Sequence, residues 1–168
     1  MRGKGSSRAK KAGRKFLAQN KRARYDYNIE ETFEAGIELL GSEVKSIREG
    51  RANLKDGFAR ISKGELFLEN VHISPYAQAG ALNHEPLRNR KLLMHRSEIR
   101  RLEGKIQERG YTVVPLSLYL NERGKIKVEL ALAKGKLLRD KRRDIAERES
   151  LRELERVKKS RATGRDLD

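Results

Sequence analysis

Apolar and polar side chains alternate along much of the middle of the chain. From Tyr25 to Leu39 the odd positions are mostly apolar and the even positions mostly polar, and this period of two is typical of a half-buried β-strand. The same alternation recurs over 112–120 and 125–132, on either side of a turn at 121–124. These patterns predict a long first strand and, later in the chain, an antiparallel hairpin.

A second hairpin and two helices are predicted between these strands. Residues 58–61 and 66–73 flank Lys63-Gly64, and a glycine there allows the positive φ of a tight turn. Residues 42–50 and 96–109 carry apolar side chains at helical spacing, with a glycine closing each stretch. Both stretches are therefore predicted to be helices.

Together these elements indicate a mainly β fold. Gly36 lies on the polar face of the first strand, at a position where a sheet can bend. Several antiparallel strands with helices at their junctions suit a small closed sheet. We expect an OB-like closed antiparallel β-barrel over residues 20–133, with two or three short helices and a long mobile loop over 77–91.

Charge divides the chain into three parts. Residues 1–24 carry ten Lys and Arg and no acid, residues 25–133 carry 17 basic and 16 acidic side chains, and residues 134–168 carry 13 basic and 8 acidic ones. The outer parts have too few apolar residues to fold alone. Residues 1–19 are predicted to be a disordered basic arm, and 134–168 a basic tail that is disordered in isolation. The net charge of +16 favours a polyanionic partner, with nucleic acid ahead of an acidic membrane surface.

The sequence argues against several other classes of protein. No stretch is apolar and long enough to span a membrane, and no signal peptide is visible, so we expect a cytoplasmic protein. The chain has no Cys and only three scattered His, which is a poor basis for a metal site. Nucleophile, phosphate-loop and dinucleotide motifs are also missing. We expect neither an enzyme nor a bound metal or cofactor.

One candidate RNA contact lies where the basic arm meets the first strand. Asn20, Lys21, Arg22 and Arg24 come just before Tyr27. Lysine and arginine bind phosphate, and aromatic faces stack on bases, so this combination favours RNA. The alternative is a solvated arm that leads into a strand whose tyrosines are buried.

Further candidates lie on the first strand and after the predicted loop. Glu34, on the polar face of the strand, either orients an arginine, accepts a hydrogen bond from a base, or is merely solvated. Arg88, Arg90 and Lys91 form a basic cluster that is followed by His95. For His95, a ring that contacts RNA and a polar residue at a helix start are equally compatible with the pattern.

Several motifs in this order resemble the SsrA-binding protein (small protein B) family. The similarity extends from Asn20 to about Arg152. Its marks are Asn20-Lys21-Arg22-Ala23-Arg24, Glu34-Ala35-Gly36, Gly41-Ser42-Glu43-Val44-Lys45-Ser46, Ile73-Ser74-Pro75, Arg88-Asn89-Arg90-Lys91-Leu92-Leu93-Met94-His95, Gly110-Tyr111-Thr112-Val113-Val114-Pro115-Leu116, Ala133-Lys134-Gly135-Lys136 and Asp140-Lys141-Arg142.

The resemblance implies a monomeric adaptor that binds the tRNA-like domain of transfer-messenger RNA. Such an adaptor brings this RNA to the vacant decoding site of a stalled ribosome, against 16S ribosomal RNA, for trans-translation. Elongation factor Tu takes part indirectly, through the RNA. The tail is implied to become a helix in the empty messenger channel. Alternatives that stay open are a structural ribosomal protein, a general OB-fold RNA-binding protein and an RNA-modifying enzyme.

The predicted site combines the residues above with those that the resemblance adds. The family usually has a second lysine where this chain has Leu137, which lowers the positive charge at that point. The predicted RNA-binding residues are Asn20, Lys21, Arg22, Arg24, Tyr27, Glu34, Lys45, Ser46, Arg88, Arg90, Lys91, His95, Lys134, Gly135 and Lys136. Those expected to engage the ribosome from the tail are Arg139, Asp140, Lys141 and Arg142.

Overall fold

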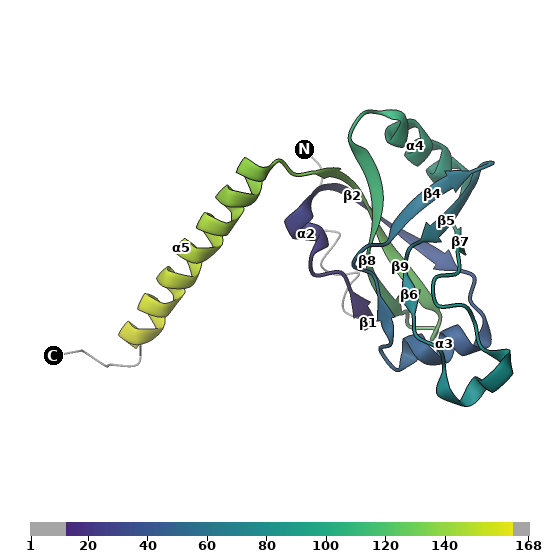
Figure 1. Cartoon of the computed structure of the whole chain (residues 1–168). Helices are drawn as coiled ribbons and strands as arrows, with labels where there is room; N and C mark the ends of the chain where they lie inside the picture. The colour runs from purple at the N-terminus through teal and green to yellow at the C-terminus, as the bar shows by residue number, and fades with distance from the viewer. Residues whose placement is uncertain (1–12, 163–168) are drawn as a thin grey trace. The chain divides into compact units, whose positions relative to one another are not determined.

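The computed structural model describes residues 13–162, which fall into two units divided between Gly135 and Lys136. The strands are β1 (Lys15–Gln19), β2 (Tyr27–Ile37), β3 (Ala52–Asn53), β4 (Phe58–Ser62), β5 (Glu65–Glu69), β6 (His72–Ile73), β7 (Arg90–Leu93), β8 (Tyr111–Leu120) and β9 (Ile126–Gly135). The helices are α2 (Ala23–Asp26), α3 (Gly41–Arg48), a 3-10 segment (Ala77–Leu82), α4 (Arg96–Gln107) and α5 (Leu138–Ala162). Figure 1 shows these elements along the chain.

Seven antiparallel strands of the first unit form a near-closed ring. Their order is β1-β8-β4-β5-β7-β2-β9, and β8 also pairs with β9. On its other edge β8 pairs with β4 at Val113 and with β1 over Ser117–Leu120. Pro115 lies between these two stretches, where a residue without an N–H is tolerated because no strand pairs with that edge. One strand thereby contacts three neighbours and closes the ring.

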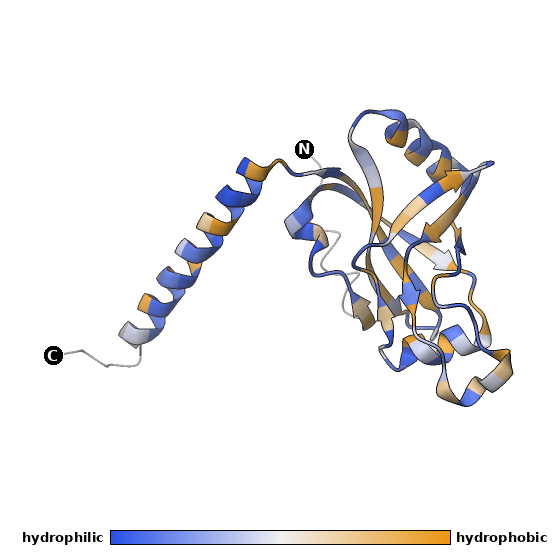
Figure 2. Ribbon diagram, in the orientation of Figure 1, coloured by the Kyte–Doolittle hydropathy of each residue, from blue (hydrophilic) through white to orange (hydrophobic). Residues whose placement is uncertain are grey.

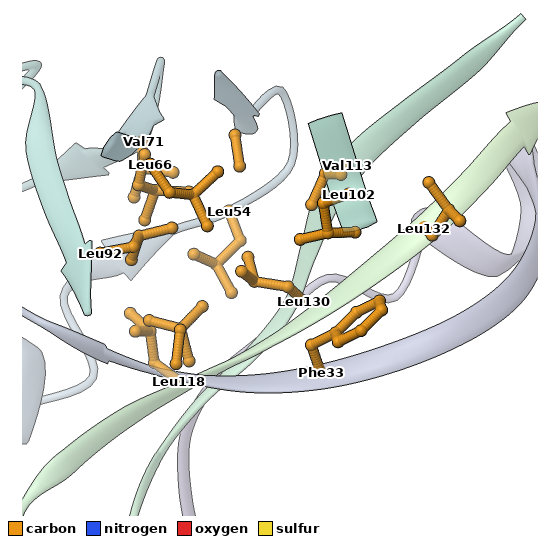
Figure 3. Packing of buried hydrophobic residues seen from close by; sticks show 14 of the residues in the cluster. Phe33, Leu54, Leu66, Val71, Leu92, Leu102, Val113, Leu118, Leu130 and Leu132 are labelled. Atoms are coloured by element: carbon orange, nitrogen blue, oxygen red, sulfur yellow. The ribbon is translucent and has the colours of Figure 1, made fainter. Parts of the chain in front are cut away.

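The main core fills the ring, and a smaller one lies outside it. Phe33, Leu118 and Leu130 belong to the main cluster, which Figure 3 shows packed between the strands. The alternate residues Val114 and Ala131 belong to the second cluster, together with Leu116, Ala133 and Ala23 of α2. Since successive side chains of a strand point to opposite faces, both faces of the β8–β9 hairpin are buried.

The sheet confirms much of the predicted pattern. The strand over 25–39, the two hairpins and the helices near 42–50 and 96–109 are present with boundaries shifted by a few residues. The antiparallel sheet was predicted correctly, but the chain as a whole is mixed α/β, not mainly β, because α5 alone has 25 residues. The expected bend at Gly36 is not where the β2–β9 register shifts, which is between Ile29 and Glu31.

Two segments differ from the sequence-based expectation. Lys15–Gln19 was assigned to the disordered arm but forms β1, since its backbone pairs with β8 and Leu17 and Ala18 pack against the main core. The expected loop 77–91 contains the 3-10 segment and the first two residues of β7. Residues 1–12 of the predicted arm lie outside the described residues.

The second unit consists mainly of α5. Its side chains from Leu138 to Ser160 are exposed or half-buried, and on the side of the helix that Figure 2 shows, polar residues surround scattered apolar ones. A helix that is polar all round does not gain stability by burying an apolar face. No helix among the described residues is long and apolar enough to cross a membrane.

Candidate nucleic-acid interface

A tight turn before β2 brings part of the predicted site to one corner of the ring. The side-chain amide of Asn20 donates to the carbonyls of Leu54 (3.2 Å) and Pro115 (3.1 Å), and its Oδ1 accepts from the N–H of Ala23 at 3.1 Å. Ala23 is 2% exposed and packs on the second cluster. Asn20 therefore holds α2 against the sheet, and its amide is already used by the protein.

The cations around this turn point to solvent. Lys21, Arg22 and Arg24 are all exposed. Arg22 lies 3.2 Å from Asp26, one helical turn away, but its side chain is still 57% exposed. Such an exposed pair contributes little to stability, so Arg22 can exchange Asp26 for a phosphate. Tyr27 is half-buried and packs against the second cluster, so only part of its ring is available for stacking.

The end of β9 lies beside this turn in the register of the sheet. Tyr27 pairs with Gly135, and Lys134 is opposite both Asn28 and Tyr111. Nζ of Lys134 is 5.4 Å from the centre of the Tyr111 ring, and Nζ of Lys105 is 5.8 Å from it. We call the set formed here the α2 corner; it comprises the exposed Lys21, Arg22, Arg24 and Lys134 and the half-buried Lys105 and Tyr111.

The hydroxyl of Tyr111 is held by an acid on β2. It donates to Oε1 of Glu30 at 2.6 Å, and this hydrogen bond raises the pKa of Tyr111. The phenol therefore stays neutral, and two ammonium groups lie within 6 Å of the centre of its ring. Ammonium groups at this distance from an aromatic face gain a cation–π attraction.

The basic cluster after the predicted loop has a different environment. Nε of Arg90 donates to Oε1 of Glu43 at 2.8 Å, and its Nη atoms donate to the carbonyls of Val71 and Pro86. Arg90 and Glu43 are both 0% exposed. The prediction that Arg90 binds RNA phosphate is therefore wrong for this structure, because its guanidinium is enclosed and fully paired.

Arg88 shares the same carboxylate from the rim of this cluster. Its Nε and Nη2 contact the two oxygens of Glu43 at 3.1 and 2.8 Å, and its side chain is 34% exposed. Burial raises the pKa of Glu43, but hydrogen bonds from Arg88 and the Leu40 N–H, with the charge of Arg90, outweigh it and lower the pKa. The carboxylate is thus ionised in the interior, where it binds both arginines.

On α3, the two predicted residues also separate into a buried and an exposed one. Ser46 is 0% exposed and donates to the carbonyl of Ser74 at 2.6 Å, so its prediction as an RNA contact is corrected to a structural role. Lys45 is exposed, with Nζ 5.2 Å from the centre of the Tyr76 ring. Nearby, His84 is buried between the hydroxyl of Ser42 and the carbonyl of Ile73, each 2.9 Å away.

Lys91 and His95 lie at neither of these places. Nζ of Lys91 is 2.7 Å from Oε1 of Glu65, and this hydrogen bond raises the pKa of Lys91. Lys91 lines a groove of about 500 Å³ with Lys63, Leu93 and residues of α4. His95 is exposed, directly precedes α4, and its carbonyl accepts from the N–H groups of Glu98 and Ile99. His95 is thus a helix-start residue with an open ring.

Glu34 is exposed on the outer face of β2, where two residues that we did not predict contact it. Nη2 of Arg14 lies 3.2 Å from its Oε2, and the hydroxyl of Tyr119 donates to the same oxygen. Arg14 stacks on Tyr119, with 4.3 Å between the guanidinium carbon and the ring centre. The alternation of β8 indicated that Tyr119 would share a face with Ser117, but no local pattern links it to Arg14.

In the second unit, the predicted residues surround the start of α5. Lys136 donates to Asp144 and is only 9% exposed, and this hydrogen bond lowers the pKa of Asp144. Arg139 and Arg142 are exposed, whereas Asp140 and Lys141 are half-buried. Apart from Asp140, the charged residues of this first stretch up to Arg143 are basic. Cations at a helix N-terminus oppose the helix dipole, so an anionic partner would stabilise this end.

No metal site is formed by the residues that the structure describes, since no three His, Cys, Asp or Glu side chains lie close enough to share an ion. The predicted RNA-binding residues of the ring instead divide among the α2 corner, the Glu43 cluster, the groove and the outer face at Glu34. Of these places, the α2 corner has the most exposed cations together with an aromatic ring.

Known proteins with related sequences and folds point the same way. The chain matches the SmpB protein family over residues 17–160. It is 63% identical over 145 residues to the SsrA-binding protein of Symbiobacterium thermophilum, covering 86% of this chain and 92% of that protein. It is 60% identical over 147 residues to the SsrA-binding protein of Moorella thermoacetica, covering 88% and 95%.

A solved structure also shares the fold. It is described as "tmRNA-SmpB: a journey to the center of the bacterial ribosome", and its chain superposes with a TM-score of 0.62 at 53% identity, over 71% of this chain and 84% of that one. Sequence identity at this level, over nearly the full length of the relatives, establishes common descent. The chain belongs to the SmpB family of SsrA-binding proteins.

Proposed function

We propose that the protein binds transfer-messenger RNA (SsrA RNA) and acts with it on the ribosome in trans-translation. In this role it is an RNA-binding adaptor and not an enzyme. It holds the tRNA-like domain of the RNA and brings it to the decoding site of a stalled ribosome, where the nascent peptide is tagged for degradation. Elongation factor Tu meets the protein only through the RNA, and the adaptor acts as a cytoplasmic monomer.

The observation that carries this proposal within the structure is the α2 corner. Lys21 and Lys134 are exposed, and the ammonium groups of Lys105 and Lys134 lie close to the half-buried ring of Tyr111. Cations that bind phosphate and an aromatic face on which a base can stack are what RNA recognition requires. The near-closed ring supports an OB-like barrel as the scaffold, a fold class that commonly binds oligonucleotides.

The tail contributes at a later step. As a 25-residue helix, α5 extends about 37 Å, long enough to follow an RNA-lined channel. Its basic start gains most when phosphate surrounds it, because released counterions then favour binding. We propose that Arg139, Asp140, Lys141 and Arg142 engage 16S ribosomal RNA in the empty messenger channel, with the tail as a helix.

Capture of RNA from a bacterial lysate tests the proposal. Tagged full-length protein is compared with a variant in which Lys21, Arg24 and Lys134 are replaced by Gln, and with one in which Asp140, Lys141 and Arg142 are replaced by Ala. The wild type and the tail variant are expected to enrich one transfer-messenger RNA, and the corner variant is expected to lose it. Between the wild type and the tail variant, which both keep the RNA, ribosome association of the captured complex should fall in the tail variant.

Two results would contradict the proposal. If ribosomal RNA dominates in all three samples and survives a high-salt wash, the protein is a structural component of the ribosome. If tRNA is retained without selectivity, it is a general RNA-binding protein. The lysine-rich surface alone would explain either result, so selectivity for one RNA is the deciding measurement.

A further inference from the structure

The two oxygens of the Glu34 carboxylate are in different situations. Oε2 accepts from the hydroxyl of Tyr119 and lies 3.2 Å from Nη2 of Arg14. Oε1 accepts no hydrogen bond from residues 13–162, and the side chain is 49% exposed. The carboxylate is therefore held through one oxygen and presents the other to solvent.

A second carboxylate makes this arrangement depend on Arg14. Glu34 and Glu129 are directly opposite on β2 and β9, and like charges in that position repel each other. Nη1 of Arg14 lies 3.7 Å from Oε1 of Glu129, so one guanidinium contacts both acids. The hydroxyl of Ser117 donates to the other oxygen of Glu129 at 3.2 Å. Arg14 thus offsets a negative charge that would otherwise repel an RNA backbone.

Tyr119 supplies a fixed donor beneath the carboxylate. Its side chain is 0% exposed, with Arg14 stacked on its ring. Burial and the hydrogen bond to Glu34 raise the pKa of Tyr119 well above its ordinary value, so the hydroxyl stays protonated. A buried ring of this kind has few alternative positions, which fixes where its hydroxyl meets Glu34.

We propose that Arg14 and Tyr119 are positioning residues for Glu34, whose Oε1 accepts one hydrogen bond from RNA. This inference rests on the proposed function, since it takes the bound RNA as given. The donor is a hydroxyl or amino group, either a ribose 2′-OH or a base amino group, because both donate to a carboxylate. Because Oε2 is already occupied, Glu34 cannot make the bidentate contact that a free carboxylate offers.

A double-mutant cycle on RNA binding tests the inference. Full-length Glu34→Ala, Tyr119→Phe and the double variant are titrated with a transcript of the tRNA-like domain. Loss of a charge-assisted contact should weaken binding about ten-fold in Glu34→Ala, and loss of its positioning about three-fold in Tyr119→Phe. The double variant should bind no more weakly than Glu34→Ala, because Tyr119 acts only through Glu34. Unchanged binding in Tyr119→Phe, or effects that multiply, would overturn the proposal.

Ser117→Ala is the matched control. It also removes a hydroxyl-to-carboxylate hydrogen bond in the same cluster, but from Glu129, and should leave RNA affinity unchanged. If the wild type itself fails to bind the transcript, the proposed function fails, not the positioning role.

Modified transcripts identify the donor. Single 2′-deoxy substitutions test the ribose hydroxyl, and single inosine-for-guanosine, purine-riboside-for-adenosine and zebularine-for-cytidine substitutions test the base amino groups. A modification that weakens binding to the wild type but not to Glu34→Ala marks the partner of Oε1. If all modifications of both kinds have the same effect on both proteins, Glu34 accepts no such bond and the proposal is overturned.

Discussion

Two groups of cations that look alike in the sequence have opposite roles in the structure. At the Glu43 cluster, Arg90 is 0% exposed and Arg88 shares the same carboxylate. At the α2 corner, Lys21, Arg24 and Lys134 are exposed, and Lys134 has an aromatic ring as its neighbour. The difference comes from Glu43, an acid placed in the interior by α3. A run of basic residues therefore predicts a ligand-binding site only if no acidic residue packs against it in the folded protein.

The largest effect is expected for loss of the buried acid of the Glu43 cluster. Glu43→Ala leaves Arg90 without its counter-charge in the interior, which should destabilise the protein by about 3–5 kcal/mol. The melting temperature should fall by roughly 10 °C or more, as measured by thermal denaturation. Glu49→Ala is the control, because the Glu49–Arg51 ion pair is exposed and long, at 3.7 Å. The melting temperature of this variant should hardly change. Equal shifts in the two variants would contradict the buried role of Glu43.

Acid should reveal the same cluster. The folded-state pKa of Glu43 is below its ordinary value of 4.5, so the stability that its charge contributes is present above about pH 4.5 and is lost as pH falls through the folded value. Arg88→Gln removes one cause of the lowered pKa, and the acid-dependent loss should become smaller. Denaturant unfolding near pH 7 and at several acidic pH values measures this difference. If the free energy of unfolding falls equally with pH in the wild type and the variant, Arg88 does not lower the pKa of Glu43.

Measurements of RNA binding test the exposed cations of the α2 corner. Lys134→Gln should lower the salt dependence of transfer-messenger RNA affinity by about one phosphate contact, or roughly 0.9 units of slope on a duplex region. Lys125→Gln removes the same charge from the turn before β9, at the other end of that strand, and should leave the slope unchanged. The measurement is a titration at several salt concentrations. A slope that changes equally in both variants would mean that only total charge matters.

The smallest effect is expected for a pair that is neither buried nor at the corner. Arg60 and Glu69 are 2.7 Å apart on β4 and β5, and the Arg60 side chain is 57% exposed. Arg60→Gln should change the free energy of unfolding by less than about 0.5 kcal/mol, as measured in urea. A loss comparable to that of Glu43→Ala would remove the distinction between buried and exposed pairs.

The sequence was most informative for the β8–β9 hairpin, where both strands alternate apolar and polar residues. The alternation over 112–120 and 125–132 predicted β8 and β9, and on β9 every second side chain from Val128 to Leu132 enters the main core. On β8 a register shift between Pro115 and Ser117 breaks the single face, so that Leu116 packs in the second cluster and Leu118 in the main core. The sequence did not reveal β1, since Lys15–Gln19 is a short segment beside many charges and its strand partner is about a hundred residues away. It also missed β7, because Arg90 is buried only through an acid 47 residues earlier.

The sequence predicted many residues of the candidate site, but not which of them the fold brings together. The exposed cations of the α2 corner, Lys21, Arg22, Arg24 and Lys134, were predicted as RNA-binding residues. Tyr111 and Lys105 were not, because they join the corner only through the register of β8 and the position of α4. Arg14 and Tyr119 were missed for the same reason, since four strands from distant parts of the chain place them beside Glu34 and Glu129. Spacing along the sequence carries no signal for such contacts.

The pairing of β1 with β8 also sets the order in which the newly synthesised chain can fold. A chain is synthesised from its N-terminus at about 5–20 residues per second, and Lys15–Gln19 waits for Ser117–Leu120 to appear before it has a strand partner. For roughly 5–20 seconds the most basic stretch of the nascent protein is unanchored, beside the RNA of the ribosome that is making it. The last hairpin to be translated is the one that completes the first strand.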